Sequence, residues 1–236
     1  SDRVMIGKMV NNSAVGIYST LYSVSSISLL VWQAIHASYV PFLFNSIGKE
    51  NTTLKKSTNS LVIIYAFVAL GLTYFAPEIV RILATPEYYE AIYIMPAIAA
   101  GIFLTCFTNL YSDIPLYYKK TKYVMYPAII VAILNVILNY ICIPIFGYMV
   151  AAYTTLISYI MWAILQAYWC KKVCNLNNIE ANTLFDDKSL FVIAFTTIML
   201  CLIGILLYNL SFLRYIFIII IIAVGSIFVY GFRKIR

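Results

Sequence analysis

The sequence predicts an all-α fold, a polytopic bundle of transmembrane helices. Long apolar stretches fill almost the whole chain of 236 residues, and the short loops between them are alternately rich and poor in lysine. Apolar residues make up 63% of the chain and charged residues only 11%. A soluble domain carries about 25% charged residues. The composition therefore indicates a protein that lies largely in hydrocarbon.

Roughly seven of these stretches are long enough to be full spans. A helix needs about 20 mainly apolar residues to cross about 30 Å of hydrocarbon. In chain order, the predicted spans are residues 18–45, 61–83, 91–116, 123–146, 149–170, 189–208 and 212–232. The chain opens with Ser1-Asp2-Arg3 and then turns apolar, which is typical of the end of a further helix whose beginning is missing.

The basic residues predict the orientation of the bundle. Twelve of the 16 lie in alternate loops and in the C-terminal tail, namely Lys49, Lys55, Lys56, Lys119, Lys120, Lys122, Lys171, Lys172, Lys188, Arg233, Lys234 and Arg236. Loops with excess Lys and Arg stay in the cytoplasm, so we expect these loops and the C-terminus to be cytoplasmic. The net charge of +7 forms no contiguous basic face or arm, which argues against nucleic acid as a partner.

Polar residues recur at helical spacing on four of the predicted spans. The stripes are Ser19, Ser23, Ser26 and Gln33; Thr105, Asn109 and Asp113; Asn135 and Asn139; and Thr155, Ser158, Trp162 and Gln166. Residues three or four apart share one face of a helix. Such side chains either hold helices together or line a polar cavity. Four aligned stripes make Gln33, Asn109, Asp113, Asn135 and Asn139 candidates for cavity lining.

The ionisable residues within the spans are few. Asp113 lies near the inner end of its span, and we expect it to reach the interface and pair with Lys119 or Lys120. His36, the chain's one histidine, is expected to be a hydrogen-bonded interior residue and, alone, makes no metal site.

Asp2 and Arg3 are the strongest site candidates in the sequence. They lie some ten residues before the outer end of the first, partial helix, and thus near the middle of the membrane. A charge at that depth is a functional candidate by default.

The sequence predicts no enzyme and no cofactor. It has no Gly-rich phosphate loop followed by Lys-Ser/Thr, no His-Glu-x-x-His and no Gly-x-Ser-x-Gly. The five cysteines form no Cys-x-x-Cys pair and are odd in number, which disfavours a disulfide framework. No catalytic or metal-ligating set is therefore assigned.

Three segments carry a resemblance to a known family. They are SDRVMIGKMVNNSAVGIYS at 1–19, PEIVRILATPEYYEA at 77–91 and YYKKTKYVMYPAIIVAILNVILNYICIPIFGYMVAAYTTLISY at 117–159. They resemble the polysaccharide repeat-unit flippases, which are the O-antigen and capsule transporters of the multidrug/oligosaccharidyl-lipid/polysaccharide exporter superfamily. The resemblance covers roughly residues 1–175 and corresponds to the C-terminal half of such a transporter.

The resemblance implies a transporter that lacks its first lobe here. Members have two six-helix lobes around a central cavity and move polyprenyl-diphosphate-linked oligosaccharides across the bacterial cytoplasmic membrane, for lipopolysaccharide or capsule biosynthesis. Residues 1–175 would be the C-terminal lobe, residues 176–236 two additional peripheral helices with a cytoplasmic tail, and the N-terminal lobe a missing partner. Arg3 becomes a candidate contact for the diphosphate, because arginine suits phosphate oxygens. Asp2 becomes the candidate carboxylate for coupling to an ion gradient.

Two alternatives remain open. A related exporter could carry another cargo, such as the lipid-linked peptidoglycan precursor or small cationic drugs. A membrane polysaccharide polymerase or acyltransferase is the rival from another class. The outer loops, such as residues 146–148 and 209–211, are too short to carry an extracellular active site and argue against that enzyme.

Overall fold

The computed structural model describes residues 2–48, 52–83 and 85–234, with the side chains of residues 83, 181 and 227–234 left aside. All regular structure in these ranges is helical, as predicted. The helices are α1 (Asp2–Met9), α2 (Asn12–Ser46), α3 (Thr52–Tyr74), α4 (Ala76–Leu83), η1 (Pro86–Ile94), α5 (Met95–Tyr117), α6 (Lys122–Phe146), α7 (Val150–Leu176), α8 (Ala181–Leu184), α9 (Asp187–Leu207) and α10 (Ser211–Lys234).

Six of the helical segments in the described residues are long and apolar enough to cross a membrane. They are α2, α3, η1 with α5, α6, α7 and α9. The seventh predicted span forms α10, which is apolar over Ser211–Ser226. The prediction of a polytopic helix bundle is therefore confirmed.

The span predicted at 61–83 is interrupted in the structure. The membrane helix α3 ends at Tyr74, and a separate short helix, α4, follows it. Pro77 has no N–H to donate to the carbonyl of Thr73, four residues earlier. The hydroxyl of Tyr208 donates to that carbonyl instead, at 2.8 Å. A proline that ends one helix thus creates a contact with the loop after α9.

A second proline is compensated in the same way inside a span. Pro127 lies within α6 and leaves the carbonyl of Tyr123 without its helical donor. The side-chain amide of Gln166 on α7 donates to this carbonyl, with the two atoms 3.4 Å apart. Gln166, one of the predicted polar residues of the spans, therefore joins helices rather than lining a cavity.

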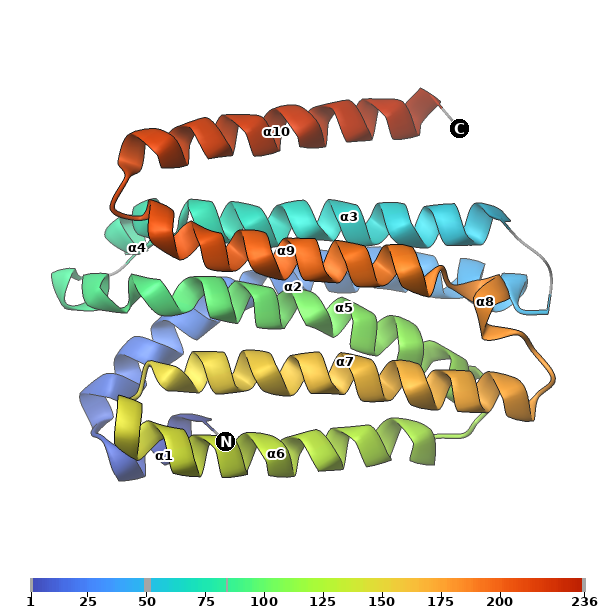
Figure 1. The fold of residues 1–236 in the computed structure, drawn as a ribbon, viewed down its shortest axis with the longest axis horizontal. Helices are drawn as coiled ribbons and strands as arrows, with labels where there is room; N and C mark the ends of the chain where they lie inside the picture. Colours follow the sequence, from blue (N-terminus) through green and yellow to red (C-terminus); the bar gives the residue numbers. More distant parts are fainter. Residues whose placement is uncertain (1, 49–51, 84, 235–236) are drawn as a thin grey trace.

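Helix α5 is the centre of the bundle (Figure 1). It packs against α2, α3, α7 and α9, and nearly every residue from Met95 to Ile114 is buried. A membrane helix that is buried on all sides touches protein rather than lipid, which makes α5 the reference against which the other helices are positioned.

Helix α6 covers the bundle with a single face. Its buried residues recur every four positions and are Pro127, Val131, Asn135, Asn139 and Ile143. This stripe packs on α7 and α1. Several other apolar side chains, including Ile133 and Ile141, are more than half exposed and suit contact with lipid. Two asparagines in the centre of an otherwise apolar buried stripe need polar partners from the neighbouring helices.

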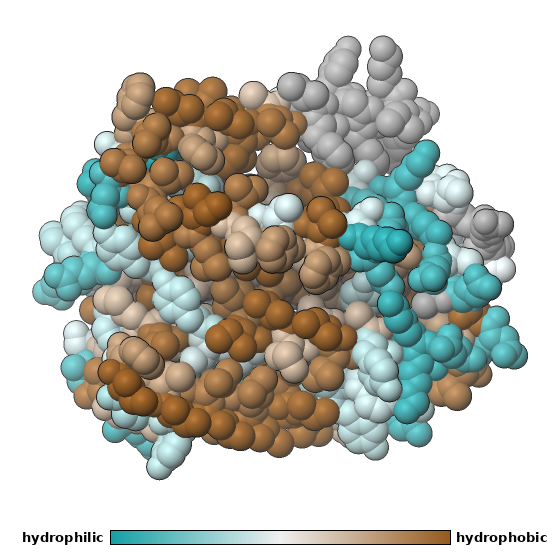
Figure 2. All heavy atoms as spheres, in the orientation of Figure 1, coloured by the Kyte–Doolittle hydropathy of each residue, from teal (hydrophilic) through white to brown (hydrophobic). Residues whose placement is uncertain are grey.

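The helix ends divide between two sides, as the lysine pattern predicts. In Figure 1 the end of α2, the start of α3, the connections α5–α6 and α7–α9 and the end of α10 lie at one end, and the connections α1–α2, α6–α7 and α9–α10 lie at the other. Figure 2 shows hydrophilic residues gathered at the first end and an apolar band between the two ends. The cytoplasmic assignment of the lysine-rich end stays a prediction.

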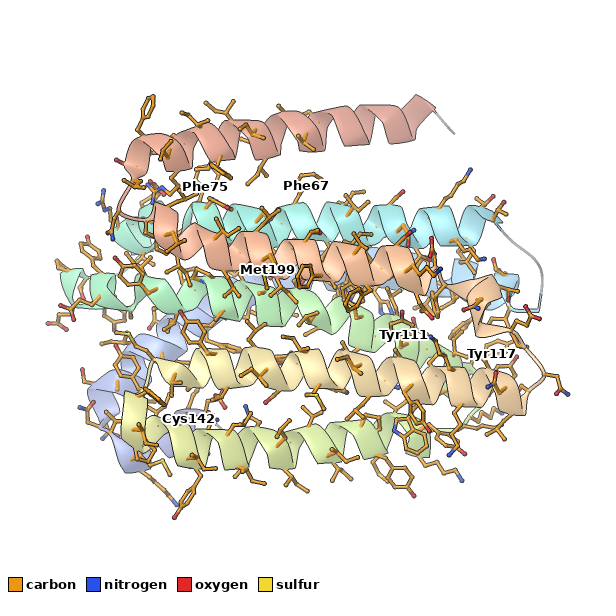
Figure 3. All side chains as sticks on the ribbon, in the orientation of Figure 1. Phe67, Phe75, Tyr111, Tyr117, Cys142 and Met199 are labelled. Atoms are coloured by element: carbon orange, nitrogen blue, oxygen red, sulfur yellow. The ribbon has the colours of Figure 1, made fainter. Side chains whose placement is uncertain are left out.

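The last two membrane helices differ in how they pack. Helix α9 lies against α3 and α5, and it accepts a hydrogen bond at the carbonyl of Leu200 from the Tyr74 hydroxyl. Helix α10 packs mainly against α3 and α9, and an apolar groove of about 530 Å³ lies between it and α3. Phe67 and Phe75 line this groove (Figure 3). The division at residue 175 stays a prediction.

Candidate functional site

The Asp2 carboxylate is the centre of a hydrogen-bond network between four helices. Its Oδ2 accepts from the Tyr18 hydroxyl of α2 at 3.0 Å and from the Thr155 hydroxyl of α7 at 2.9 Å. Its Oδ1 accepts from the side-chain amide of Asn139 on α6 at 2.8 Å. Hydrogen bonds to an ionised acceptor are about twice as strong as those between neutral groups. Three helices therefore converge on one carboxylate supplied by α1.

The two predicted asparagines extend this network. The Asn139 amide also donates to Asn135 Oδ1 at 3.4 Å, and its Oδ1 accepts from the Thr154 hydroxyl. The Asn135 amide in turn donates to the Thr155 hydroxyl at 3.2 Å. We call these residues, Asp2, Tyr18, Asn135, Asn139, Thr154 and Thr155, the Asp2 network.

A cavity of about 330 Å³ borders the Asp2 network. Asp2, Asn135, Thr155 and Ser158 supply its polar wall, and Tyr22, Tyr159 and Trp162 supply aromatic surface. Because α1, α2, α6 and α7 all contribute, the cavity lies between helices rather than on the surface of one helix. Of the predicted cavity-lining residues, Asp2 and Asn135 line this cavity, and three aromatic side chains share its wall with the polar ones.

Arg3 lies beside the cavity and is exposed on the surface of the described chain. Its guanidinium carbon sits 5.7 Å from the centroid of the Tyr22 ring, which lines the cavity. A cation over an aromatic face at this distance is attracted by the ring. Asp2 and Arg3 thus have different partners. Asp2 bonds within the Asp2 network, and Arg3 contacts Tyr22 at the edge of the cavity.

One face of α2 is polar and partly uncovered. The α2 polar face comprises Ser19, Ser23, Ser26 and Gln33, of which Ser23 and Gln33 are exposed and the other two half-buried. The hydroxyls of Ser23 and Ser26 bond back to carbonyls of their own helix, both at 2.7 Å. Gln33 lies far along α2 from Tyr18 and is not part of the Asp2 network.

Asp113 has a different partner from the one predicted. Its Oδ2 lies 2.9 Å from Nε2 of His36 on α2, and Asp113 itself is only 5% exposed. The expected pairing with Lys119 or Lys120 is wrong. Asp113 lies on the side of α5 that faces α2, and Lys120 instead approaches Asn177. The prediction that His36 is hydrogen-bonded is confirmed.

The predicted residues therefore separate into three groups. Asp2, Asn135 and Asn139 come together, with Arg3 at the edge; Asp113 pairs with His36; and Asn109, half-buried on α5, and Gln33 stand apart from both. Sequence reasoning missed Tyr18 as a partner of Asp2. A tyrosine early in α2 could have indicated this contact, because α2 runs back along α1. Whether the tyrosine faces Asp2 depends on the turn at Asn11.

The described residues contain no cluster of three or more His, Cys, Asp or Glu side chains that could hold a metal ion. The oxygens gathered around Asp2 come from one carboxylate, amides and hydroxyls. Such a set can exchange a proton or bind a small hard cation, for which oxygen ligands are preferred.

Comparison with known proteins gives two matches. The model of a family described as MatE matches residues 1–141, a range that contains every predicted site residue. The probable low-salt glycan biosynthesis flippase Agl15 of Haloferax volcanii is 27% identical over 175 residues, which cover 71% of this chain and 37% of that protein. The chain thus corresponds to well under half the length of this relative. No solved structure matches.

Proposed function

Because this multi-pass membrane chain belongs to the MatE family, we propose that it forms one wall of an export path for lipid-linked oligosaccharides. The observation that carries the proposal is the α2 polar face. The exposed Gln33 amide is costly against lipid tails, whereas the Ser23 and Ser26 hydroxyls are satisfied within their own helix. The face therefore needs water or further protein in front of it, as the wall of a path between two lobes would have.

The second wall would come from an N-terminal lobe of the same transporter. Internal repeats with the substrate site at their interface are general among secondary transporters. The chain's match to 37% of the Haloferax volcanii flippase leaves room for such a lobe in a protein of that length. Helix α6 offers mainly apolar side chains outwards and is the less suitable wall.

The relative and the charge of Arg3 support the proposed cargo class. The matched protein is named a probable glycan biosynthesis flippase. Arg3, exposed beside Tyr22, would contact the diphosphate of a polyprenyl-diphosphate-linked oligosaccharide, because guanidinium binds phosphate oxygens in pairs. We propose O-antigen or capsule repeat units as the oligosaccharide and the bacterial cytoplasmic membrane as the location, with the lysine-rich loops and C-terminus inside.

Asp2 is the proposed coupling carboxylate. It lies among hydroxyl and amide groups from three other helices and borders a cavity large enough for water. Loss of its charge on binding a proton or a small cation would weaken three charge-assisted hydrogen bonds together. One binding event would thus loosen α1 from α2, α6 and α7.

Thiol labelling tests the wall. In the intact transporter with its natural cysteines replaced, the thiols introduced by Gln33→Cys and Ser23→Cys are expected to react with a charged, membrane-impermeant reagent. Ile133→Cys, on the exposed apolar face of α6, is the matched control and is expected to stay unreacted. Equal protection of all three thiols would show that the α2 polar face lines no aqueous path.

Complementation tests the cargo. The intact gene is expected to restore surface polysaccharide in a strain that lacks its repeat-unit flippase, and Arg3→Ala is expected to reduce that output at normal protein levels. Unchanged output with Arg3→Ala would remove Arg3 from the mechanism. Rescue only of a strain lacking the peptidoglycan lipid flippase would favour the alternative cargo.

A further inference from the structure

We propose that His36 and Asp113 form a proton-binding site that holds α2 against α5, separate from the Asp2 network. His36 Nε2 and Asp113 Oδ2 lie 2.9 Å apart and join α2 to the central buried helix α5. This site is independent of the cargo and of the role proposed for Asp2.

The surroundings of the pair favour a shared proton. Asp113 is 5% exposed, and an unpaired carboxylate buried to that degree is costly. A single proton shared between the carboxylate and the imidazole leaves the pair electrically neutral, whereas its loss leaves a net buried charge. The paired state therefore retains one exchangeable proton.

The groups that the structure places beside the pair are aromatic, hydroxyl and thiol groups. Trp32 stacks on His36 at 5.5 Å and 25°, and Tyr65 of α3 lies next to Trp32 at 5.2 Å. Tyr39 of α2, bonded to Thr58 of α3, and Cys170 of α7 interact electrostatically with Asp113. Asp187 at the start of α9 interacts with Cys170 and is paired with Lys171.

The position of His36 on α2 gives the proton a route. His36 lies between the buried residues of α2, such as Trp32 and Tyr39, and the α2 polar face, whose exposed Gln33 is one turn earlier. Its side chain remains 21% exposed. Protons can therefore enter from the side of the α2 polar face, while Asp113 behind it stays enclosed.

The backbone of α2 is weakened next to the pair. Pro41 lies inside the helix and cannot donate to the carbonyl of Ala37, the residue that follows His36. Prolines are the usual points at which helices kink. Breaking the pair would therefore release α2 close to a position where it can bend. His36 itself lies some 27 Å along the helix from Tyr18, at about 1.5 Å per residue.

Trp32 fluorescence tests the site without any cargo. In the full chain in nanodiscs, carrying Trp162→Phe and Trp169→Phe, Trp32 is the chain's remaining tryptophan, and a protonated imidazole stacked on it quenches its emission. Between pH 5 and 9, one step in emission is expected. The step should be absent in His36→Gln and should move by about 1 to 3 pH units to lower pH in Asp113→Asn, as for loss of an opposite charge.

Thermal unfolding supplies the second measurement and guards against a folding defect. If the paired state binds the proton, the unfolding temperature of the unsubstituted chain falls as pH rises through the range in which Trp32 emission changes. His36→Gln should show a flat profile over that range. Emission that is constant with pH in the unsubstituted chain, or an unchanged step in folded His36→Gln, would overturn the proposal.

Discussion

Asn139 of α6 donates a hydrogen bond of 2.8 Å to Asp2 of α1, a residue 137 positions earlier in the chain. The same asparagine accepts from Thr154 of α7, so one fully buried amide joins three helices. In α6 it interrupts a stripe of apolar residues. A polar residue in that position stabilises the bundle only while all its partners are in place.

We expect Asn139→Leu to lower the free energy of unfolding by about 1–3 kcal/mol, because Asp2 and Thr154 both lose a buried partner. Thermal unfolding of the detergent-solubilised protein measures the change. Tyr140→Leu is the matched control, since Tyr140 follows directly and is 67% exposed. A double-mutant cycle with Asp2→Asn should give a non-zero coupling energy, and strict additivity would argue against a direct contact.

The attachment of α10 depends on an ion pair with α4. Arg214 is 4% exposed and pairs with Glu78, which also accepts from the Tyr215 hydroxyl at 2.8 Å. We expect Arg214→Leu to weaken the docking of α10 by about 3 kcal/mol, since breaking a buried pair leaves a charge uncompensated. Hydrogen exchange of Ser211–Ser226 should accelerate while α5 stays protected.

The exposed Arg81 of α4 is the control for this prediction, and Arg81→Leu should leave exchange in α10 unchanged. Equal exchange in both variants would mean that lipid and apolar contacts alone hold α10 in place.

Close packing of α9 on α3 predicts an effect of a single methyl group. A Cβ at Gly204 would lie 2.7 Å from Thr73 Cγ2, whereas one at Gly71 of α3 would meet nothing within 4 Å. We expect Gly204→Ala to destabilise the protein by about 1–3 kcal/mol through overpacking. Gly71→Ala should be neutral or slightly stabilising, as for alanine in a helix interior. Comparable unfolding temperatures of the two variants would contradict the close approach.

The Asp186 cap at the start of α9, outside the membrane-spanning segments, should make the stability of the protein depend on pH. Asp186 caps this helix by accepting from the backbone N–H of Ser189 at 3.3 Å and from its hydroxyl at 2.6 Å. These hydrogen bonds lower the pKa of the Asp186 carboxyl. Because the pKa is lower in the folded state, the stabilisation is present above the unfolded pKa of about 3.9 and is lost as pH falls through the folded one.

At pH 7 we expect Asp186→Ala to cost about 1 kcal/mol, a typical value for an N-cap. Asp186→Asn should cost less, because an amide oxygen still accepts. The difference between the unsubstituted protein and Asp186→Ala should shrink in unfolding measurements at progressively more acidic pH. A difference that persists undiminished there would assign the effect to packing.

The sequence by itself determined the membrane environment, the helical fold class and the approximate position of each apolar helix. Hydropathy and helix length are local properties, and the alternation of the lysine-rich loops with the lysine-poor ones follows from helices that cross one after another. The sequence also identified Asp2, Asn135 and Asn139 as polar residues within apolar stretches, where a polar side chain is costly.

Only the tertiary structure decided which polar residues meet. The partner of Asp113 depends on which side of α5 faces α2, and that rotation is set by the packing of α5 between four other helices. The spacing of residues within one span gives its faces but not the neighbours of each face. For this reason the contact of Asp2 with Asn139, and the pairing of Asp113 with His36 instead of a lysine, followed from the arrangement of the helices in the bundle.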